Sequence, residues 1–413
     1  MTAPSVAETG SLDRAGINGA QARCSTVNGQ KPCILFLHPG PGPLHTEPRL
    51  NMFHHLGARV GGAAIFASWA RDRAECEAWR SRTLPACGGF DYRPVPTYHV
   101  RWEWLRPFRT LAVMYREALR ASAALPAPVD VVVGYSPYGV GFVAWLVAKT
   151  LGVPLVIQVQ NDMRFAYLGH HGPLVAIKKR ASRLISRFVL SRAKGWHVYF
   201  PEQTGEVQLR SDQERFQFTD FTPVSSVPTS PDEQREFLLV GYPWEVKGVD
   251  LAIRAFRQAG ESLGGWTLRV IGHCPNREPY ERLAGGDPRI VFEGATLHLT
   301  VLDRIARCGV YLLPSRTEAY GRVAIEAMAA GRPIIGSRVG GIPTYVEDGV
   351  CGLLVPPEDV SALRDAMVRL AQDQELRSNL GRRGREIALD RHREERWVAR
   401  FENMIRSVRT CAT

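Results

Sequence analysis

The sequence predicts two doubly wound α/β domains joined by a linker, and three observations support this fold class. The chain has 413 residues, which is more than a single hydrophobic core usually serves. Short, continuous apolar runs alternate with helix-length stretches, a pattern typical of parallel sheets covered by helices on both faces. The alternation occurs on both sides of the proline-rich segment 221–232 (FTPVSSVPTSPD), which we interpret as the edge of an interdomain linker.

The first series of apolar runs predicts an N-terminal domain over residues 31–228. Residues 1–30 lack both a periodic apolar pattern and a signal-peptide core, so we expect a flexible tail there. The turn-rich segment 39–43 (PGPGP) follows the first strand, and its Gly40 and Gly42 either cradle a phosphate or form only a rigid turn. Strands are expected at 33–38, 63–67, 129–134 and 155–159, and helices at 49–57, 140–151 and 174–192.

The second series predicts a C-terminal domain over residues 229–385, followed by a last segment, 386–413. In that segment Trp397, Phe401, Met404 and Ile405 recur at helical spacing and predict a helix at 394–408 with a buried face. Strands are expected at 237–241, 267–272, 290–293, 310–314 and 333–336, and helices at 249–258, 299–308 and 323–330.

The charge of the chain is its one unusual global property. The formal net charge is +11, which favours anionic partners such as nucleic acid, an acidic membrane surface or phosphate-bearing substrates. No zinc finger, RNA-binding signature or basic leucine zipper is present, and we therefore expect no specific nucleic-acid binding. The basic, amphipathic helix expected at 174–192 is either a solvated face or a contact with an anionic membrane surface.

The composition also excludes several classes of protein. No apolar run approaches the roughly 18 residues of a membrane-spanning helix. The eight cysteines form no C-x-x-C pair, and the histidines show no zinc spacing, so we expect reduced thiols and no metal site. These features predict a cytoplasmic protein whose membrane contact, if it has one, is peripheral and at the inner face.

The residues that carry chemistry gather in the stretch 314–355 (PSRTEAYGRVAIEAMAAGRPIIGSRVGGIPTYVEDGVCGLLV). A strand ends there in a loop that contains Glu318, and Gly321 then allows a close approach of backbone to ligand at the start of a helix. Glu326 follows about one turn into that helix. The unpaired N–H groups of a helix start bind phosphate, and flanking carboxylates can hold sugar and ribose hydroxyls.

This stretch resembles the retaining glycosyltransferases of family four, also called the group 1 glycosyltransferases. The pair Glu318 and Glu326 matches the Glu-x7-Glu motif of that family, within E-A-Y-G-x-x-x-x-E-A-M-A-x-G-x-P-I-I, and G-G-I-P-x-x-V-x-D-G-x-x-G-x-L-V extends the match. The resemblance implies the GT-B architecture: two Rossmann-like domains face a cleft, and the C-terminal helix crosses back to the N-terminal domain.

The same resemblance implies the reaction. A sugar would pass, with retention of configuration, from a nucleotide-diphosphate sugar to an unidentified acceptor, whether a glycan, a lipid-linked molecule or a natural product. The nucleotide sugar is a co-substrate, and no cofactor or metal is obligatory, in keeping with the lack of a D-x-D segment at a strand end. Residues 31–228 would form the acceptor side, and residues 229–385 the donor side.

Individual roles follow from the matched motifs. Glu318 would contact the donor sugar and support its developing oxocarbenium charge, and Glu326 would hold the ribose. Lys247, in V-G-x-x-x-x-x-K-G-V-D, would hold the diphosphate, where an ammonium stabilises the charge of the leaving group. The other expected donor-binding residues are Tyr320 and Gly321 of the motif, Tyr242, Gly272 of a V-I-G element and Gly294 of an F-E-G element.

The sequence departs from the family pattern at two places. Tyr242 stands where the family has an arginine that shares the diphosphate with the lysine, so more of that charge would fall to Lys247. On the acceptor side, Gln160, Asn161 and Asp162 occupy the loop where many members place a histidine. The amide of Gln160 could hydrogen-bond the sugar or the acceptor, and we count Gln160 and Asp162 as cleft residues of the N-terminal domain.

Two alternatives remain beside the transferase. A nucleotide-sugar epimerase can share this architecture, although it usually needs acid–base side chains in the N-terminal loops. A protein that only binds a sugar nucleotide would agree with the departures at Gln160 and Tyr242. Release of a nucleoside diphosphate separates the transferase from the binding protein.

Overall fold

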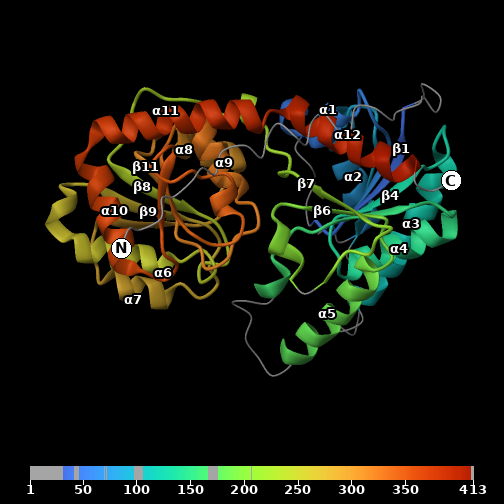
Figure 1. Cartoon of the computed structure of the whole chain (residues 1–413), viewed down its shortest axis with the longest axis horizontal. Helices are drawn as coiled ribbons and strands as arrows, with labels where there is room; N and C mark the ends of the chain where they lie inside the picture. The colour runs from blue at the N-terminus through green and yellow to red at the C-terminus, as the bar shows by residue number, and fades with distance from the viewer. Residues whose placement is uncertain are drawn as a thin grey trace, which may run out of the picture. The chain divides into compact units, whose positions relative to one another are not determined.

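The computed structural model describes residues 31–40, 46–68, 70, 72–96, 106–165, 175–205 and 207–410. These residues form two parallel sheets flanked by helices (Figure 1), which confirms the predicted fold class of two doubly wound α/β domains. The expected tail over residues 1–30 and the loop glycine Gly42 lie outside the described ranges. The domain boundaries at 228 and 385 stay predictions.

The N-terminal sheet has seven strands in the order β3-β2-β1-β4-β5-β6-β7, and all its strand pairs are parallel. Leu35 packs on one face of this sheet, and Ile34 and Phe36 pack on the other, all of them buried. Burial on both faces explains why the strand sequences are continuously apolar. The elements are β1 Cys33–His38, α1 Met52–Leu56, β2 Gly61–Ser68, α2 Arg73–Thr83, β3 Asp91–Pro96, α3 Arg106–Ala124, β4 Val131–Gly134, α4 Gly139–Leu151, β5 Leu155–Gln158, α5 Val175–Leu190, β6 Gly195–Val198 and β7 Glu214–Gln217.

The C-terminal sheet has six strands in the order β10-β9-β8-β11-β12-β13, again all parallel. Two helices in this part begin at aspartate caps, because Asp359 accepts from the N–H of Ala362 and Asp373 from that of Leu376. The elements are β8 Glu236–Val240, α6 Val249–Ala259, β9 Thr267–Ile271, α7 Glu278–Ala284, β10 Ile290–Glu293, α8 His298–Arg307, β11 Val310–Leu313, α9 Arg322–Ala329, β12 Ile334–Ser337, β13 Gly352–Val355, α10 Val360–Gln372 and α11 Gln374–Arg391.

The last helix, α12 (Glu394–Thr410), packs on the N-terminal sheet, as the resemblance implies. Trp397 and Phe401 are buried in the same core as Phe36 of β1, and α12 lies beside α1 (Figure 1). Its first residue is fixed to the segment between the sheets, because Glu394 accepts hydrogen bonds of 3.0 and 2.8 Å from the N–H and the hydroxyl of Ser225. Within the described ranges, no helix combines the length and the apolarity needed to cross a bilayer.

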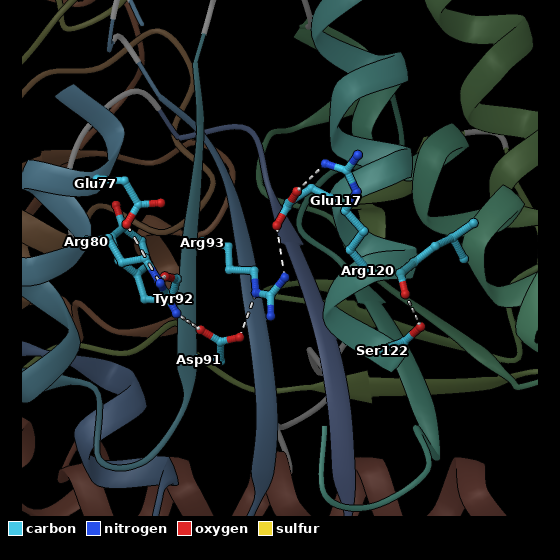
Figure 2. A network of polar contacts seen from close by, with 9 residues as sticks. Glu77, Arg80, Asp91, Tyr92, Arg93, Glu117, Arg120 and Ser122 are labelled. Atoms are coloured by element: carbon cyan, nitrogen blue, oxygen red, sulfur yellow. Dashed lines mark hydrogen bonds and ion pairs between the residues drawn. The ribbon is translucent and has the colours of Figure 1, made fainter. Parts of the chain in front are cut away.

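The edge strand β3 is held to its flanking helices by charged side chains (Figure 2). Asp91 accepts from Arg80 of α2 at 2.9 Å and from Arg93 at 2.6 Å, and these contacts lower the pKa of the Asp91 carboxyl against the effect of burial. Arg93 also donates to Glu117 of α3 at 2.9 Å. This hydrogen-bonded network adds charged contacts to the apolar packing of Tyr92 and Val95 on the same strand.

Candidate active site

The loop between β11 and α9 carries the Glu-x7-Glu pair, and glycines determine its path. Gly321 caps α9 with φ of 69°, where a Cβ atom would lie 2.4 Å from the hydroxyl of Tyr345. Gly340, with φ of 51°, would place a Cβ only 2.1 Å from the carbonyl oxygen of Glu318, and the N–H of Gly341 donates to that same oxygen at 2.9 Å. A larger residue at these glycines would displace Glu318.

Lys247 and Glu318 form the centre of the site. The Lys247 Nζ lies 2.5 Å from Glu318 Oε2, and the two side chains keep 20% and 10% of their surface exposed. Gly248, in the left-handed conformation at the start of α6, would place a Cβ 2.0 Å from the carbonyl oxygen of Pro314. The K-G-V-D segment and the motif loop therefore lie in direct backbone contact, which brings the ammonium to the carboxylate.

Glu326 is fully buried in α9. One carboxylate oxygen, Oε1, lies 2.9 Å from His298 Nε2 and 3.9 Å from Arg322 Nε. The other, Oε2, has no hydrogen-bond partner among the described residues. A buried carboxylate oxygen without a donor is costly, so this oxygen is suited to accept a ligand hydroxyl.

His298 is a residue of this site that the sequence analysis missed. It lies at the first position of α8, shortly after the F-E-G element. A lone histidine carries no motif, and only its place after the carboxyl end of a parallel strand could have indicated it.

The other residues that the sequence predicts on the donor side have different surroundings. Tyr320 is buried, and its hydroxyl lies 3.0 Å from Thr222 Oγ1. Gly272, with φ of 155°, would place a Cβ 2.2 Å from the carbonyl oxygen of Gly241, so it permits the ends of β8 and β9 to approach. Tyr242 is 57% exposed and faces the ring of His273 at 5.8 Å. Gly294 is exposed, with no atom within 4 Å of where its Cβ would stand.

A second group of polar side chains gathers after the carboxyl ends of the N-terminal strands. Tyr135 donates to Asp220 at 2.6 Å, and Tyr199 donates to the amide oxygen of Gln160. The ring centroid of Tyr199 lies 5.2 Å from that of Tyr320, so this group reaches the motif loop. Tyr135, Tyr199 and Asp220 were not singled out by the sequence, because none of them belongs to a motif.

His38 ends β1 within this second group. The N–H of Gly40 donates to its Nδ1 at 2.7 Å, and its ring centroid lies 4.0 Å from that of Tyr135. Burial, and then the charge of Arg322, lower the pKa of His38 to about 3, so the imidazole is neutral at physiological pH. A Cβ on Gly40 would lie 2.3 Å from the same Nδ1, so in this structure Gly40 orients His38.

The loop after β5 holds the other two expected cleft residues. The Asp162 side chain is 1% exposed and forms an ion pair of 2.7 Å with Arg164, which neutralises it within its own loop. The amide nitrogen of Gln160 has no hydrogen-bond partner among the described residues. In the same ranges, no three His, Cys, Asp or Glu side chains gather closely enough to hold a metal ion.

Both halves of the chain match known protein families. The family of glycosyl transferases group 1 matches residues 234–373, and a glycosyl transferase 4-like domain matches residues 56–211.

Individual proteins are similar over shorter stretches. N-acetyl-alpha-D-glucosaminyl L-malate synthase of Bacillus anthracis is 36% identical over 118 residues, 29% of this chain and 30% of that protein. Alpha-D-kanosaminyltransferase of Streptomyces kanamyceticus is 26% identical over 269 residues, 58% of this chain and 67% of that protein. The matches thus span about a third to two thirds of the length of these relatives.

Solved structures resemble the chain over most of its length. Sucrose-phosphate synthase from Thermosynechococcus elongatus has a TM-score of 0.67 at 20% identity, covering 91% of this chain and 99% of that one. HepE from Anabaena, in complex with UDP and glucose, has a TM-score of 0.68 at 16% identity, with the same coverage. At such identities the likeness concerns the fold. The Glu-x7-Glu loop, the parallel sheets and the two family matches agree, and the chain belongs to the group 1 glycosyltransferases.

Proposed function

We propose that this protein is a retaining glycosyltransferase that moves a sugar from a nucleotide-diphosphate sugar to an acceptor. The observation that carries the proposal is the contact of 2.5 Å between Lys247 and Glu318 at the start of α9. A cation, a carboxylate and a helix N-terminus meet there, which suits a diphosphate and the sugar attached to it. Residues 31–228 form the acceptor side in this proposal, residues 229–385 the donor side, and residues 386–413 the crossover.

The geometry gives each group a task in this reaction. The departing diphosphate gains negative charge, and the ammonium of Lys247 together with the N–H groups of α9 stabilises it. As Lys247 turns to the phosphates, Glu318 is released to accept hydrogen bonds from the sugar and to face its developing positive charge. Glu326 accepts from the ribose. The neutral, half-buried His38 and the Asp220 carboxylate line the acceptor side in this proposal.

The experiment is a panel of UDP-, GDP- and dTDP-sugars, with UDP donors first because the similar Anabaena protein binds UDP and glucose. We expect one donor to raise the melting temperature and to release its nucleoside diphosphate when an acceptor extract is added. The anomeric configuration of the product, read by NMR, reports retention. An inverted sugar still attached to its nucleotide would support the epimerase instead, and binding without release would support the non-catalytic protein.

Replacing Glu326 by glutamine is expected to weaken nucleotide binding about tenfold without unfolding the protein. The change keeps the shape of the side chain but turns a charge-assisted hydrogen bond to the ribose into a neutral one. Calorimetric titration with the nucleoside diphosphate measures the effect, and an unaltered melting temperature serves as the control for folding. Equal affinity of the variant and the wild type would remove Glu326 from the donor site.

We also propose a peripheral contact with an anionic membrane surface through α5. This helix carries Lys178, Lys179, Arg180, Arg183 and Arg187 and no acidic residue. Ile177 and Leu184, which are 65% and 61% exposed, are seven residues apart and therefore lie on one side of the helix. Apolar side chains flanked by basic ones are typical of a helix that lies in the membrane interface.

Sedimentation with lipid vesicles tests this contact. We expect the protein to bind phosphatidylglycerol vesicles but not phosphatidylcholine vesicles. It should dissociate from the former as the salt concentration rises. Leu184→Ser should weaken vesicle binding several-fold, because it removes apolar surface from the interface. Leu297→Ser is the matched control, because Leu297 is 77% exposed but lies outside α5. Equal losses in the two variants, or binding to both kinds of vesicle, would contradict the proposal.

A further inference from the structure

The arginines around the motif loop differ in whether a carboxylate forms hydrogen bonds with their guanidinium group. Arg316 donates to both carboxylate oxygens of Asp250, at 2.7 and 2.9 Å. Arg338 donates to Asp348 at 2.8 Å. Arg322 has no hydrogen bond to any described residue, and its closest carboxylate oxygen, on Glu326, is 3.9 Å from Nε, beyond hydrogen-bond distance. Half of the Arg322 side-chain surface, 50%, remains accessible.

Arg322 stands where positive potential is already concentrated. It is the first residue of α9, directly after Gly321, and no side chain caps this helix. The free N–H groups of the helix and the guanidinium therefore face the same end.

Two buried polar atoms that have no hydrogen-bond partner in the described part of the chain lie beside this end of α9. They are the second carboxylate oxygen of Glu326 and the hydroxyl of Tyr345, in side chains that are 0% and 2% exposed. Native proteins rarely leave such atoms unsatisfied, and a polar ligand at the helix start would meet this need.

The guanidinium also acts on groups of the acceptor side. Partial burial opposes the charge of Arg322, yet its pKa is raised because the carboxylates of Glu326 and Asp220 stabilise the charged form. In return, Arg322 adds to burial in lowering the pKa of His38. Arg322 therefore interacts electrostatically both with the motif loop and with the polar group at the ends of the N-terminal strands.

We propose that Arg322 is an anion-binding residue of this site, whose guanidinium takes a phosphate or carboxylate group of a substrate. Its five donors form a planar fork that matches such oxyanions, and it supplies the second cation that Tyr242 does not. The inference rests on the proposed function for the source of the anion. Two molecules can bring it: the nucleoside diphosphate of the donor, or an acceptor that carries a phosphate or carboxylate.

Calorimetric titration of the full chain tests the proposal with UDP and GDP, the matching monophosphates and nucleosides, and inorganic phosphate. The variants are Arg322→Gln and Arg322→Lys, the second of which keeps the charge but loses the planar guanidinium. Arg338→Gln is the matched control, since Arg338 is 52% exposed in the same part of the chain. If the donor brings the anion, Arg322→Gln weakens binding of the nucleoside diphosphate at least tenfold and that of the nucleoside less than twofold. The affinity of the lysine variant for the nucleoside diphosphate lies between those of the wild type and the glutamine variant. The affinity of the Arg338→Gln control equals that of the wild type.

If the acceptor brings the anion, nucleotide affinity is unchanged, and inorganic phosphate binds the nucleotide-saturated wild type but not the Arg322→Gln variant. The proposal is overturned if that variant binds diphosphate and phosphate like the wild type. It is also overturned if nucleoside and diphosphate lose affinity equally, since Arg322 would then act through Glu326 and the ribose. A wild type that binds no nucleotide would sink the proposed function, yet loss of phosphate binding in the variant would still support the anion site.

Discussion

Lys247→Ala is expected to lower kcat/KM toward the upper end of the roughly 10²–10³-fold that one preorganised electrostatic group contributes. In the proposed reaction Tyr242 stands where the family has an arginine, so Lys247 would carry most of the charge of the leaving diphosphate. The structure adds a second reason. Glu318, only 10% exposed, would lose the ammonium at 2.5 Å, and its uncompensated charge would repel the phosphates.

A double-mutant cycle with Tyr242→Arg isolates the interaction. Tyr242 is 57% exposed, so an arginine fits there without disturbing the core, and it should restore part of the activity of the alanine variant. Arg254→Ala in α6, which removes the same charge from an exposed position, should leave kcat/KM unchanged. If Lys247→Ala loses less than about tenfold, well below the range for such a group, the diphosphate is held by other residues, and Arg322 becomes the first candidate.

Phe401→Ala is expected to destabilise the N-terminal sheet and its helices by about 3–5 kcal/mol. Phe401 is fully buried, and its ring centroid lies 5.1 Å from that of Trp397, so its loss leaves a cavity lined by apolar side chains. Urea unfolding followed by circular dichroism measures the change, with exposed Arg400→Ala as the control on the same helix. A change below about 1 kcal/mol, smaller than typical core truncations, would mean that α12 does not complete this core.

Several strands were predictable because their side chains are buried on both faces. β1, β4 and β5 are continuously apolar for this reason, and their sequences alone indicate them. β7 (ERFQ) has alternately half-buried and exposed residues at the edge of the sheet. β3 (DYRPVP) contains charged residues that form ion pairs with two helices. Neither gives the apolar signal of a central strand, because packing and charge partners far away in the sequence hold them.

The candidate site also contains residues that the sequence could predict and residues that it could not. Glu318 and Glu326 share one motif, so their common loop could be predicted, and the sheet order then explains why Lys247, 71 residues earlier, reaches Glu318. His298 and Asp220 carry no local pattern. They join the site only because parallel strands end at one edge of a sheet, which a single sequence does not reveal.

The packing of α12 affects the order in which the two sheets can complete their folding during synthesis. The N-terminal sheet, with Phe36 in its core, is translated first, but the helix that covers this core emerges from the ribosome only after the whole C-terminal sheet. Domains usually fold as they are synthesised, the N-terminal one first. Here the apolar surface that α12 covers stays exposed until this last helix has been made, so the first core can be completed only after the second sheet has been synthesised. Separate production of the first half would require that α12 be attached to it.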